Sequence, residues 1–310
     1  MKAVRGVEGG VAVVEIEEPP GAGELIELRS ASICGSDFGY IQAGTRFILG
    51  HELAGVASDG SAVAVEAMYG CGNCPFCTEG RYNLCARQAE AALGLLTDGG
   101  MAEHFRAPTE RLVPLPAGLK VADGSLVEPT AVAWHGLRLA GVEKGHRVAV
   151  VGGGAIGLLA VAAARAMGAE EVGLDARHAR QIEVGERLGA TTPSGLYDVV
   201  VEAAGTPSAV ERSVELAAPG GAAVILGVHF GSLALPFLSM FLKELRIIPS
   251  IGYCAHDQGR DVEDAAALLA SKPDIAAALV THRFPLEEAQ EAFRVAGDRR
   301  AGAIKVVLEV

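Results

Sequence analysis

The sequence contains no long uninterrupted hydrophobic run. A membrane-spanning helix needs about 20 consecutive apolar residues, and the nearest match, residues 148–167, is interrupted by a glycine cluster and by Arg165. Residues 1–6 lack both the apolar segment and the small-residue cleavage site of a secretory signal peptide. These absences predict a cytoplasmic protein that does not associate with a membrane.

Positive charge is also scarce. The chain has 26 Lys and Arg residues against 38 Asp and Glu residues, which gives a formal net charge of −12. Because an acidic surface repels a phosphate backbone, we expect no nucleic-acid partner. Hydrophobic residues make up 50% of the chain and charged residues only 21%, which excludes a disordered protein. A length of 310 residues exceeds what one hydrophobic core usually holds, so two domains are predicted.

The hydrophobic pattern changes near residue 126. Before it, short apolar runs separated by Gly and Pro predict a mostly β domain. After it, strands alternate with helices, which indicates βαβ units and a doubly wound parallel sheet, and hence an α/β fold. The predicted strands of this second part are residues 147–151, 171–175, 198–202, 222–226 and 245–248, and its predicted helices are residues 155–167, 207–217 and 261–269.

Four of the six cysteines, Cys71, Cys74, Cys77 and Cys85, follow the spacing C-x2-C-x2-C-x7-C. In a reducing compartment such a cluster indicates a metal rather than disulfide bonds. Tetrahedral zinc takes four thiolates at about 2.3 Å, and four cysteines leave no open position, which indicates a structural site. An iron–sulfur cluster is the alternative, because four cysteines also hold such clusters.

A second group of metal-binding residue types surrounds Cys34. The segment Cys-Gly-Ser-Asp at residues 34–37 is followed by Gly-His-Glu at residues 50–52. A catalytic zinc keeps about three protein ligands and an open position for water or substrate. Cys34, His51 and a carboxylate satisfy that requirement, so we predict a catalytic zinc here.

A glycine-rich turn follows the predicted strand 147–151. Residues 152–157 read Gly-Gly-Gly-Ala-Ile-Gly and match G-x-G-x-x-G between a buried strand and a helix. The first glycine permits the tight turn, the second lets the backbone approach a pyrophosphate, and the third permits close helix–strand packing. The helix N-terminus offers its amides to the phosphates. The residues predicted to bind the dinucleotide here are Gly152, Gly154, Ala155, Ile156 and Gly157, together with Gly227.

Asp175 ends the next predicted strand. Its carboxylate is expected to bind the ribose hydroxyls and to repel a 2′-phosphate, which favours NAD. Arg177, His178 and Arg180 follow, and basic residues at this point accommodate a 2′-phosphate or form a solvated helix end. NAD is the predicted cofactor, with Arg180 included in its site, and NADP is the alternative.

Taken in order, these motifs carry a family resemblance. The segments at residues 34–37 and 50–52, the four-cysteine lobe, Glu-Pro at residues 128–129 and the glycine-rich turn resemble the zinc-dependent medium-chain alcohol and polyol dehydrogenases of the sorbitol and threonine dehydrogenase type. The resemblance covers essentially the whole chain. It implies a GroES-like catalytic domain at residues 1–127, a Rossmann domain at residues 128–272, and a return to the catalytic domain at residues 273–310.

The resemblance also implies roles for individual residues. Cys34 and His51 would bind the catalytic zinc, and one or other of Glu52 and Glu128 would bind it, directly or through water. We hypothesise that the two glutamates exchange with water on the metal.

Two further residues follow Cys34 in the same motif. Asp37 would accept a hydrogen bond from the other ring nitrogen of His51 and fix its orientation, or it caps a turn. The resemblance implies that Ser36 contacts the alcohol oxygen and carries its proton outward. Zinc would act as a Lewis acid and the nicotinamide would accept the hydride.

The sequence departs from the family pattern at three places. The segment 190–197 is short where relatives place a further strand and helix, which predicts an open adenine side of the cofactor pocket. The connection before residues 62–65 is trimmed. A histidine that often follows the motif at residues 34–37 is absent; Phe38 and Tyr40 stand there and either line the substrate pocket or pack in the core.

The reaction predicted from these residues is oxidation of a secondary alcohol or polyol to a ketone with NAD. A primary-alcohol or aldehyde enzyme of the same family is the first alternative. A non-catalytic redox sensor that binds zinc and NAD is the second, and a zinc-free quinone reductase the third. The substrate is expected to be a small-molecule alcohol. A homo-oligomer, either dimer or tetramer, is predicted, with the apolar segment 236–241 at an interface or in the pocket.

Overall fold

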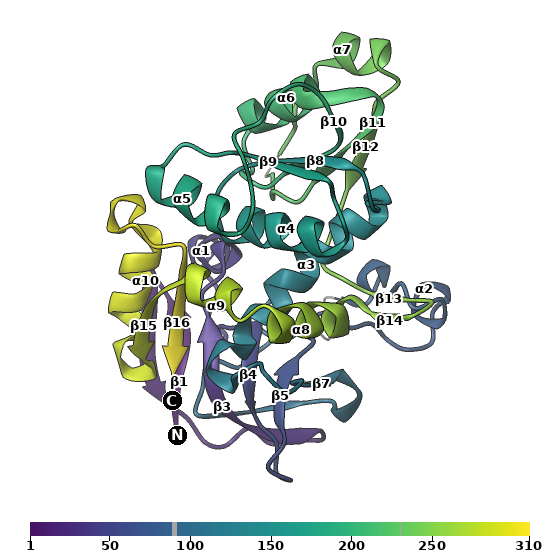
Figure 1. Cartoon of the computed structure of the whole chain (residues 1–310). Helices are drawn as coiled ribbons and strands as arrows, with labels where there is room; N and C mark the ends of the chain where they lie inside the picture. Colours follow the sequence, from purple (N-terminus) through teal and green to yellow (C-terminus); the bar gives the residue numbers. More distant parts are fainter. Residues whose placement is uncertain (89–91, 230) are drawn as a thin grey trace. The chain divides into compact units, whose positions relative to one another are not determined.

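A computed structural model describes residues 1–88, 92–229 and 231–310, and the chain forms two compact units. Unit 1 contains Met1–Glu128 and Cys254–Val310, and unit 2 contains Pro129–Tyr253. Unit 1 is rich in β-strands and unit 2 holds a parallel sheet with helices (Figure 1). The α/β fold class is therefore confirmed.

Unit 1 is built on a seven-stranded sheet of order β15-β16-β3-β4-β5-β7, in which β6 also pairs with β3. β16 runs antiparallel to β3, so the yellow end of the chain lies beside its purple beginning (Figure 1). The strands are β3 (Glu24–Ser32), β4 (Glu52–Val56), β5 (Ala62–Val65), β6 (His104–Ala107), β7 (Leu112–Pro114), β15 (Val280–Pro285) and β16 (Lys305–Glu309).

Shorter elements complete unit 1. Two hairpins are formed by β1 (Lys2–Val7) with β2 (Gly10–Glu15) and by β13 (Ala255–His256) with β14 (Gly259–Arg260). The helices are α1 (Gly35–Gln42), α2 (Pro75–Thr78), α8 (Asp261–Ser271), α9 (Asp274–Leu279) and α10 (Ala289–Gly297), and the 3₁₀ turns include η1 (Tyr82–Leu84) and η4 (Val121–Leu126).

Alternation of side chains along the strands creates the core of unit 1. Ile26 and Leu28 on β3 point to the same side and are fully buried. They belong to a cluster that also contains Leu53, Phe105 and Phe293. The core thus joins β3, β4 and β6 to α10, a helix from the end of the chain.

Unit 2 contains a five-stranded parallel sheet of order β12-β11-β10-β8-β9. Its strands are β8 (Arg147–Val151), β9 (Glu171–Asp175), β10 (Tyr197–Glu202), β11 (Ala217–Ile225) and β12 (Arg246–Pro249), and its helices are α4 (Ala155–Ala166), α5 (Ala179–Arg187), α6 (Pro207–Leu216) and α7 (Phe237–Leu242). Helix α3 (Val127–Ala140) begins in unit 1 and continues into unit 2.

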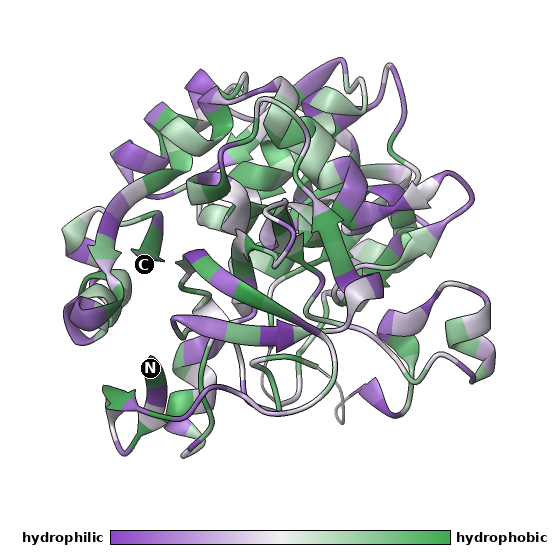
Figure 2. Cartoon of the chain, turned by 90° about the horizontal axis from the view of Figure 1, so that it is seen from below, coloured by the Kyte–Doolittle hydropathy of each residue, from purple (hydrophilic) through white to green (hydrophobic). Residues whose placement is uncertain are grey.

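Continuous hydrophobic runs build this parallel sheet. Four of the five residues of β8 are buried, as expected for a strand covered on both faces. Figure 2 shows the hydrophobic colour gathered on strands and on one side of several helices, with hydrophilic colour on their outer parts. In the described residues, no helix is long and apolar enough to cross a bilayer.

The boundary between the units differs from the predicted boundary at residue 272. Residues 254–272, which the sequence analysis assigned to the Rossmann domain, lie in unit 1. Arg260 explains the difference, because its guanidinium donates to Glu66 and to the backbone oxygens of Glu110 and Leu112. The alternation of strands and helices carries no information about such a contact.

The further strand that relatives place between α5 and β10 is represented here by a single bridge. After α5, Thr191 makes an isolated parallel bridge with Gly173 of β9, and the chain then enters β10. The shortened segment 190–197 therefore leaves β9 at the edge of the five-stranded sheet.

Candidate metal centres and nucleotide site

The four-cysteine lobe brings its sulfur atoms together. The Sγ atoms of Cys71, Cys74, Cys77 and Cys85 all lie within 4.8 Å of one another. A tetrahedral zinc with bonds of about 2.3 Å needs sulfur atoms roughly 3.8 Å apart, so this donor set fits zinc. A Cβ at Gly70 would lie 2.4 Å from the Cys77 sulfur, and this glycine therefore keeps the space beside the thiols open.

Local hydrogen bonds prepare these thiols for a cation. The backbone N–H of Asn73 lowers the pKa of Cys71 to about 6, whereas burial raises the pKa of Cys77 to about 11. The N–H groups of Cys71 and Arg87 donate to the Cys85 sulfur and lower its pKa. Because thiolates are the ligands of zinc, the hydrogen bonds to Cys71 and Cys85 favour the charge state that binds it, whereas burial opposes that state at Cys77.

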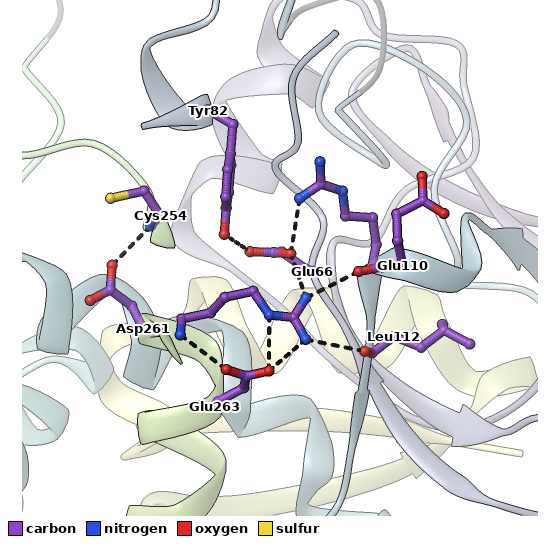
Figure 3. Close-up of polar contacts among 9 residues, drawn as sticks. Glu66, Tyr82, Glu110, Leu112, Cys254, Asp261 and Glu263 are labelled. Carbon is purple, nitrogen blue, oxygen red and sulfur yellow. Dashed lines mark hydrogen bonds and ion pairs between the residues drawn. The ribbon is translucent and has the colours of Figure 1, made fainter. Parts of the chain in front are cut away.

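A buried carboxylate anchors the lobe to the sheet. Glu66, which follows β5, is fully buried and accepts a hydrogen bond from the hydroxyl of Tyr82, between the third and fourth cysteines. Arg111 and Arg260 donate to its other oxygen at 3.3 and 3.1 Å. Figure 3 shows Tyr82 and Glu66 pointing toward one another. Arg260 also donates to Glu263 at 2.9 Å. Sequence reasoning missed this network because its members are far apart in the chain.

A second donor cluster contains Cys34, His51 and Glu52, with ligand atoms within 4.8 Å of one another. Cys34 is the N-cap of α1 directly after β3, and Glu52 begins β4. The antiparallel pairing of these strands places Ser32 opposite Glu52. The sheet register therefore joins the two motifs at residues 34–37 and 50–52.

Asp37 holds one side of His51. Its Oδ1 lies 3.6 Å from His51 Nδ1, and its Oδ2 accepts a 2.9 Å hydrogen bond from the Cys34 N–H. Burial raises the pKa of Asp37, and burial alone would lower the pKa of His51. The charges of Cys34 and Asp37 outweigh burial at His51 and hold its pKa well above the usual value. With Nδ1 facing Asp37, Nε2 is the nitrogen that can bind a metal.

Glu52 belongs to a buried ion pair. Both carboxylate oxygens accept from Lys305 Nζ, at 2.9 and 2.6 Å, and Oε2 also accepts from the Ser32 hydroxyl. The three side chains are almost completely buried. Burial alone would lower the pKa of Lys305, but the charge of Glu52 keeps it raised. Sequence reasoning missed Lys305, which starts β16.

The other residues predicted for the catalytic site differ in their distance from the donor cluster of Cys34, His51 and Glu52. Glu128 is buried, and its charge raises the pKa of His51, although it lies outside the donor cluster of Cys34, His51 and Glu52. Burial, followed by the charge of Cys34, raises the pKa of Tyr40, whose ring lies 6.3 Å from that of Phe47. Phe38 instead packs edge-on against Phe293 in the core. Ser36 is half-buried on α1.

The glycine-rich turn in unit 2 has the geometry of a phosphate cradle. Gly152 has a φ of 116°, and a Cβ there would approach Ala203 at 2.9 Å. A Cβ at Gly157 would clash with the Gly152 oxygen at 1.8 Å, whereas the space beside Gly154, the N-cap of α4, is open. Ala155 and Ile156 form the first turn of α4. This open helix N-terminus fits a pyrophosphate.

Asp175 lies beside the glycine-rich turn and forms an ion pair with an arginine. Its backbone oxygen accepts from the Gly152 N–H, and its Oδ2 accepts a 2.7 Å hydrogen bond from Arg212 on α6. Arg212 was not identified from the sequence. Arg180 pairs with Glu183 on α5, 3.0 Å away.

Gly227 follows the end of β11 and lies against the loop after β10. A Cβ there would meet Glu202 Oε2 and the Gly205 nitrogen, both at 2.4 Å. Glu202 Oε1 accepts from the N–H groups of Ala204 and Gly205. The loops after β10 and β11 are thereby held together at the carboxyl ends of the strands, where ligands of parallel sheets bind.

Two family models together match most of the chain. The alcohol dehydrogenase GroES-like domain matches residues 21–117, and the glucose dehydrogenase C-terminus matches residues 122–310.

Individual relatives match over nearly their whole length. The chain is 30% identical to sorbitol dehydrogenase of Gallus gallus over 334 residues, covering 94% of this chain and 90% of the relative. It resembles the structure of galactitol-1-phosphate dehydrogenase from Escherichia coli with a TM-score of 0.91 and 29% identity, covering all of both chains. A zinc-binding dehydrogenase structure from Sinorhizobium meliloti 1021, bound to NADP, gives a TM-score of 0.87 and 31% identity over 100% and 99% of the two chains.

Proposed function

Because the chain belongs to the zinc-type medium-chain alcohol and polyol dehydrogenases, a family of NAD(P)-dependent enzymes, we propose that it oxidises a secondary alcohol or polyol to a ketone. The observation that carries this proposal is the donor cluster of Cys34, His51 and Glu52, which lies beside Asp37 and is separate from the four-cysteine lobe. A closed lobe and an incomplete buried cluster are what a structural and a catalytic zinc require.

We assign Cys34 and His51 to the catalytic zinc, with Glu128 as the nearby carboxylate. When bound, zinc supplies a Lewis acid that makes an alcohol more acidic, and the nicotinamide accepts a hydride. Glu52 is fully engaged by Lys305 and Ser32. We therefore propose that Glu52 tunes the charge of the centre, whereas Glu128 supplies the exchangeable ligand.

Ser36 and Asp37 complete the proposed centre. Asp37 orients the imidazole of His51 so that one nitrogen faces the metal. Ser36, half-buried on the same helix, would relay the proton of the alcohol outward, accepting it as its own hydroxyl proton passes toward solvent. The four cysteines of the lobe hold the structural zinc.

The cofactor occupies the glycine turn of unit 2. Gly152, Gly154 and Gly157 shape the cradle for the pyrophosphate, whose charge the amides of Ala155 and Ile156 complement. Asp175 binds the adenosine ribose, which makes NAD a substrate.

The relatives support a polyol as the substrate, because they include sorbitol dehydrogenases and D-xylulose reductases. A primary-alcohol or aldehyde enzyme remains the alternative within the family. Turnover of a panel of primary alcohols, secondary alcohols and polyols distinguishes the two.

The deciding experiment measures nicotinamide reduction by purified full-length protein with that panel, before and after treatment with a zinc chelator. We expect chelator-sensitive reduction with at least one polyol or secondary alcohol, and two zinc ions per chain. Protein that holds two zinc ions, binds NAD and oxidises no member of the panel would contradict the proposal and favour a redox sensor.

We propose that a second copy of the chain covers α7 and the edge strand β12. Four large apolar side chains of α7 are 65–72% exposed: Phe237, Leu238, Phe241 and Leu242. Such an exposed hydrophobic patch is unusual on a monomeric protein. β12 ends the parallel sheet in the part of the chain that is described, so its outer edge can pair with a strand. Light scattering should give the mass of a dimer or tetramer, and Phe241→Glu should reduce it; a monomeric wild-type protein would contradict this proposal.

A further inference from the structure

Asp175 accepts a hydrogen bond from an arginine of α6, and a second arginine contacts the same helix. Arg212 Nε donates to its Oδ2 at 2.7 Å, and Arg212 Nη1 also donates to Glu215 at 3.0 Å. Arg177, two residues after Asp175, donates to the hydroxyl of Ser208 at 3.2 Å. Ser208 and Arg212 are four residues apart on α6 and therefore share one face of that helix. Two guanidinium groups thus lie on or against α6, and one of them pairs with Asp175.

The reduced third strand leaves this place accessible. A pocket of about 170 Å³ lies against Asp175 and Arg212, and its lining includes Ile182 and Thr191. Thr191 makes the single bridge that stands where a longer strand and helix are absent. The side chains of Asp175 and Arg212 are 35% and 41% exposed, so both can reach a bound molecule.

Charge decides what the pocket accepts. A carboxylate alone at this position repels a 2′-phosphate. Here Arg212 offsets the charge of Asp175 at contact distance, and Glu186 is the other charged residue of the lining. Arg177 lies outside the lining and adds a second positive charge through its contact with Ser208 on α6. Within the described residues Arg212 Nη2 makes no hydrogen bond, so it is available to an anion. Guanidinium groups suit phosphate because their donors match two of its oxygens.

We propose that Arg212 determines cofactor specificity and, with Arg177, binds the adenosine 2′-phosphate, so that the protein accepts NADP as well as NAD. This inference rests on the proposed dinucleotide site and names the group that selects between two cofactors. Asp175 retains contact with the ribose when NAD binds. Arg212 takes the phosphate when NADP binds, while its Nε bond to Asp175 persists.

The test measures direct binding of two nucleotide fragments to the full-length protein by calorimetry. Adenosine 2′,5′-bisphosphate carries the 2′-phosphate, and 5′-AMP lacks it. We expect wild-type protein to bind the bisphosphate at least as tightly as 5′-AMP. Arg212→Met should weaken bisphosphate binding at least tenfold, the factor of one charge-assisted hydrogen bond, and change 5′-AMP binding less than about threefold.

Matched variants separate charge from folding. Arg187→Met removes an exposed arginine of α5 and should leave both affinities unchanged. Arg212→Lys retains the charge and should recover part of the bisphosphate affinity. An unchanged bisphosphate affinity in Arg212→Met would overturn the inference.

Two results with wild-type protein would also overturn it. Tight 5′-AMP binding with bisphosphate binding a hundredfold weaker would leave the proposed NAD-dependent function intact. Failure of both fragments to bind would remove the proposed nucleotide site as well.

Discussion

Unit 1 contains two clusters of metal-binding side chains, and they are built in opposite ways. The lobe takes all four donors from residues 71–85, and three of its cysteines are only half-buried. The cluster around Cys34 takes donors from separate segments and surrounds them with buried charges, Asp37 and the Glu52–Lys305 pair. A site that only holds a metal can be assembled by a local turn. A site that leaves a metal position open needs the whole sheet to fix its neighbours.

The largest expected effect comes from separating the two clusters by mutation. Cys34→Ala should reduce turnover about a thousandfold or more, because it removes a ligand of the Lewis acid. Zinc content should fall from two ions per chain to one. Cys71→Ala is the matched variant and should lose the other zinc, with turnover of the surviving folded protein within about tenfold of wild type. Equal loss of turnover in both variants would contradict the division of roles.

The buried ion pair gives the next largest effect, on stability. Lys305→Met leaves Glu52 buried without its cation, which should lower the free energy of unfolding by about 3–5 kcal/mol in urea denaturation. The double variant Glu52→Gln/Lys305→Met should recover much of that loss. Lys2→Met, which breaks an exposed pair with Glu287, serves as the control and should leave the free energy of unfolding almost unchanged. Similar losses in both lysine variants would show that burial does not distinguish the pairs.

A smaller effect on zinc affinity is expected at Asp37, which only orients the metal ligand His51. Asp37→Asn keeps the shape of the side chain but weakens its hold on His51. We expect the affinity for the catalytic zinc to fall about 10–100-fold in a competition assay with a chelator. The lobe zinc should be unaffected in the same titration. Unchanged affinity at both sites would mean that Asp37 is only a helix-capping residue.

The smallest effect concerns the anchor of the lobe. Tyr82→Phe removes one of three donors to Glu66 and should lower the free energy of unfolding by about 1–3 kcal/mol. Zinc bound to the lobe should dissociate faster, while turnover stays near wild type. Glu79→Gln, at an exposed pair with Arg81, is the control and should cost about 0–1 kcal/mol. Equal behaviour of the two variants would show that Glu66 does not anchor the lobe.

Sequence reasoning reached the parts of this molecule that are encoded locally. The parallel sheet, the glycine turn and the spacing of the four cysteines each depend on neighbouring residues, and the predicted family and fold class are confirmed. The roles of Lys305, Glu66 and Arg212 could not be predicted from the sequence, because each depends on a partner far away in the chain. Residues 254–272 were assigned to the other domain for the same reason.

The pairing of Glu52 with Lys305 also has a consequence for synthesis of the chain. Protein emerges from the ribosome N-terminal end first, so the lobe has all its donors once residue 85 is outside. Lys305, the partner of Glu52, is translated 253 residues later. The nascent chain can therefore bring together the four donors of the proposed structural zinc early. The charge of Glu52, beside the proposed catalytic centre, is balanced only when β16 joins the sheet.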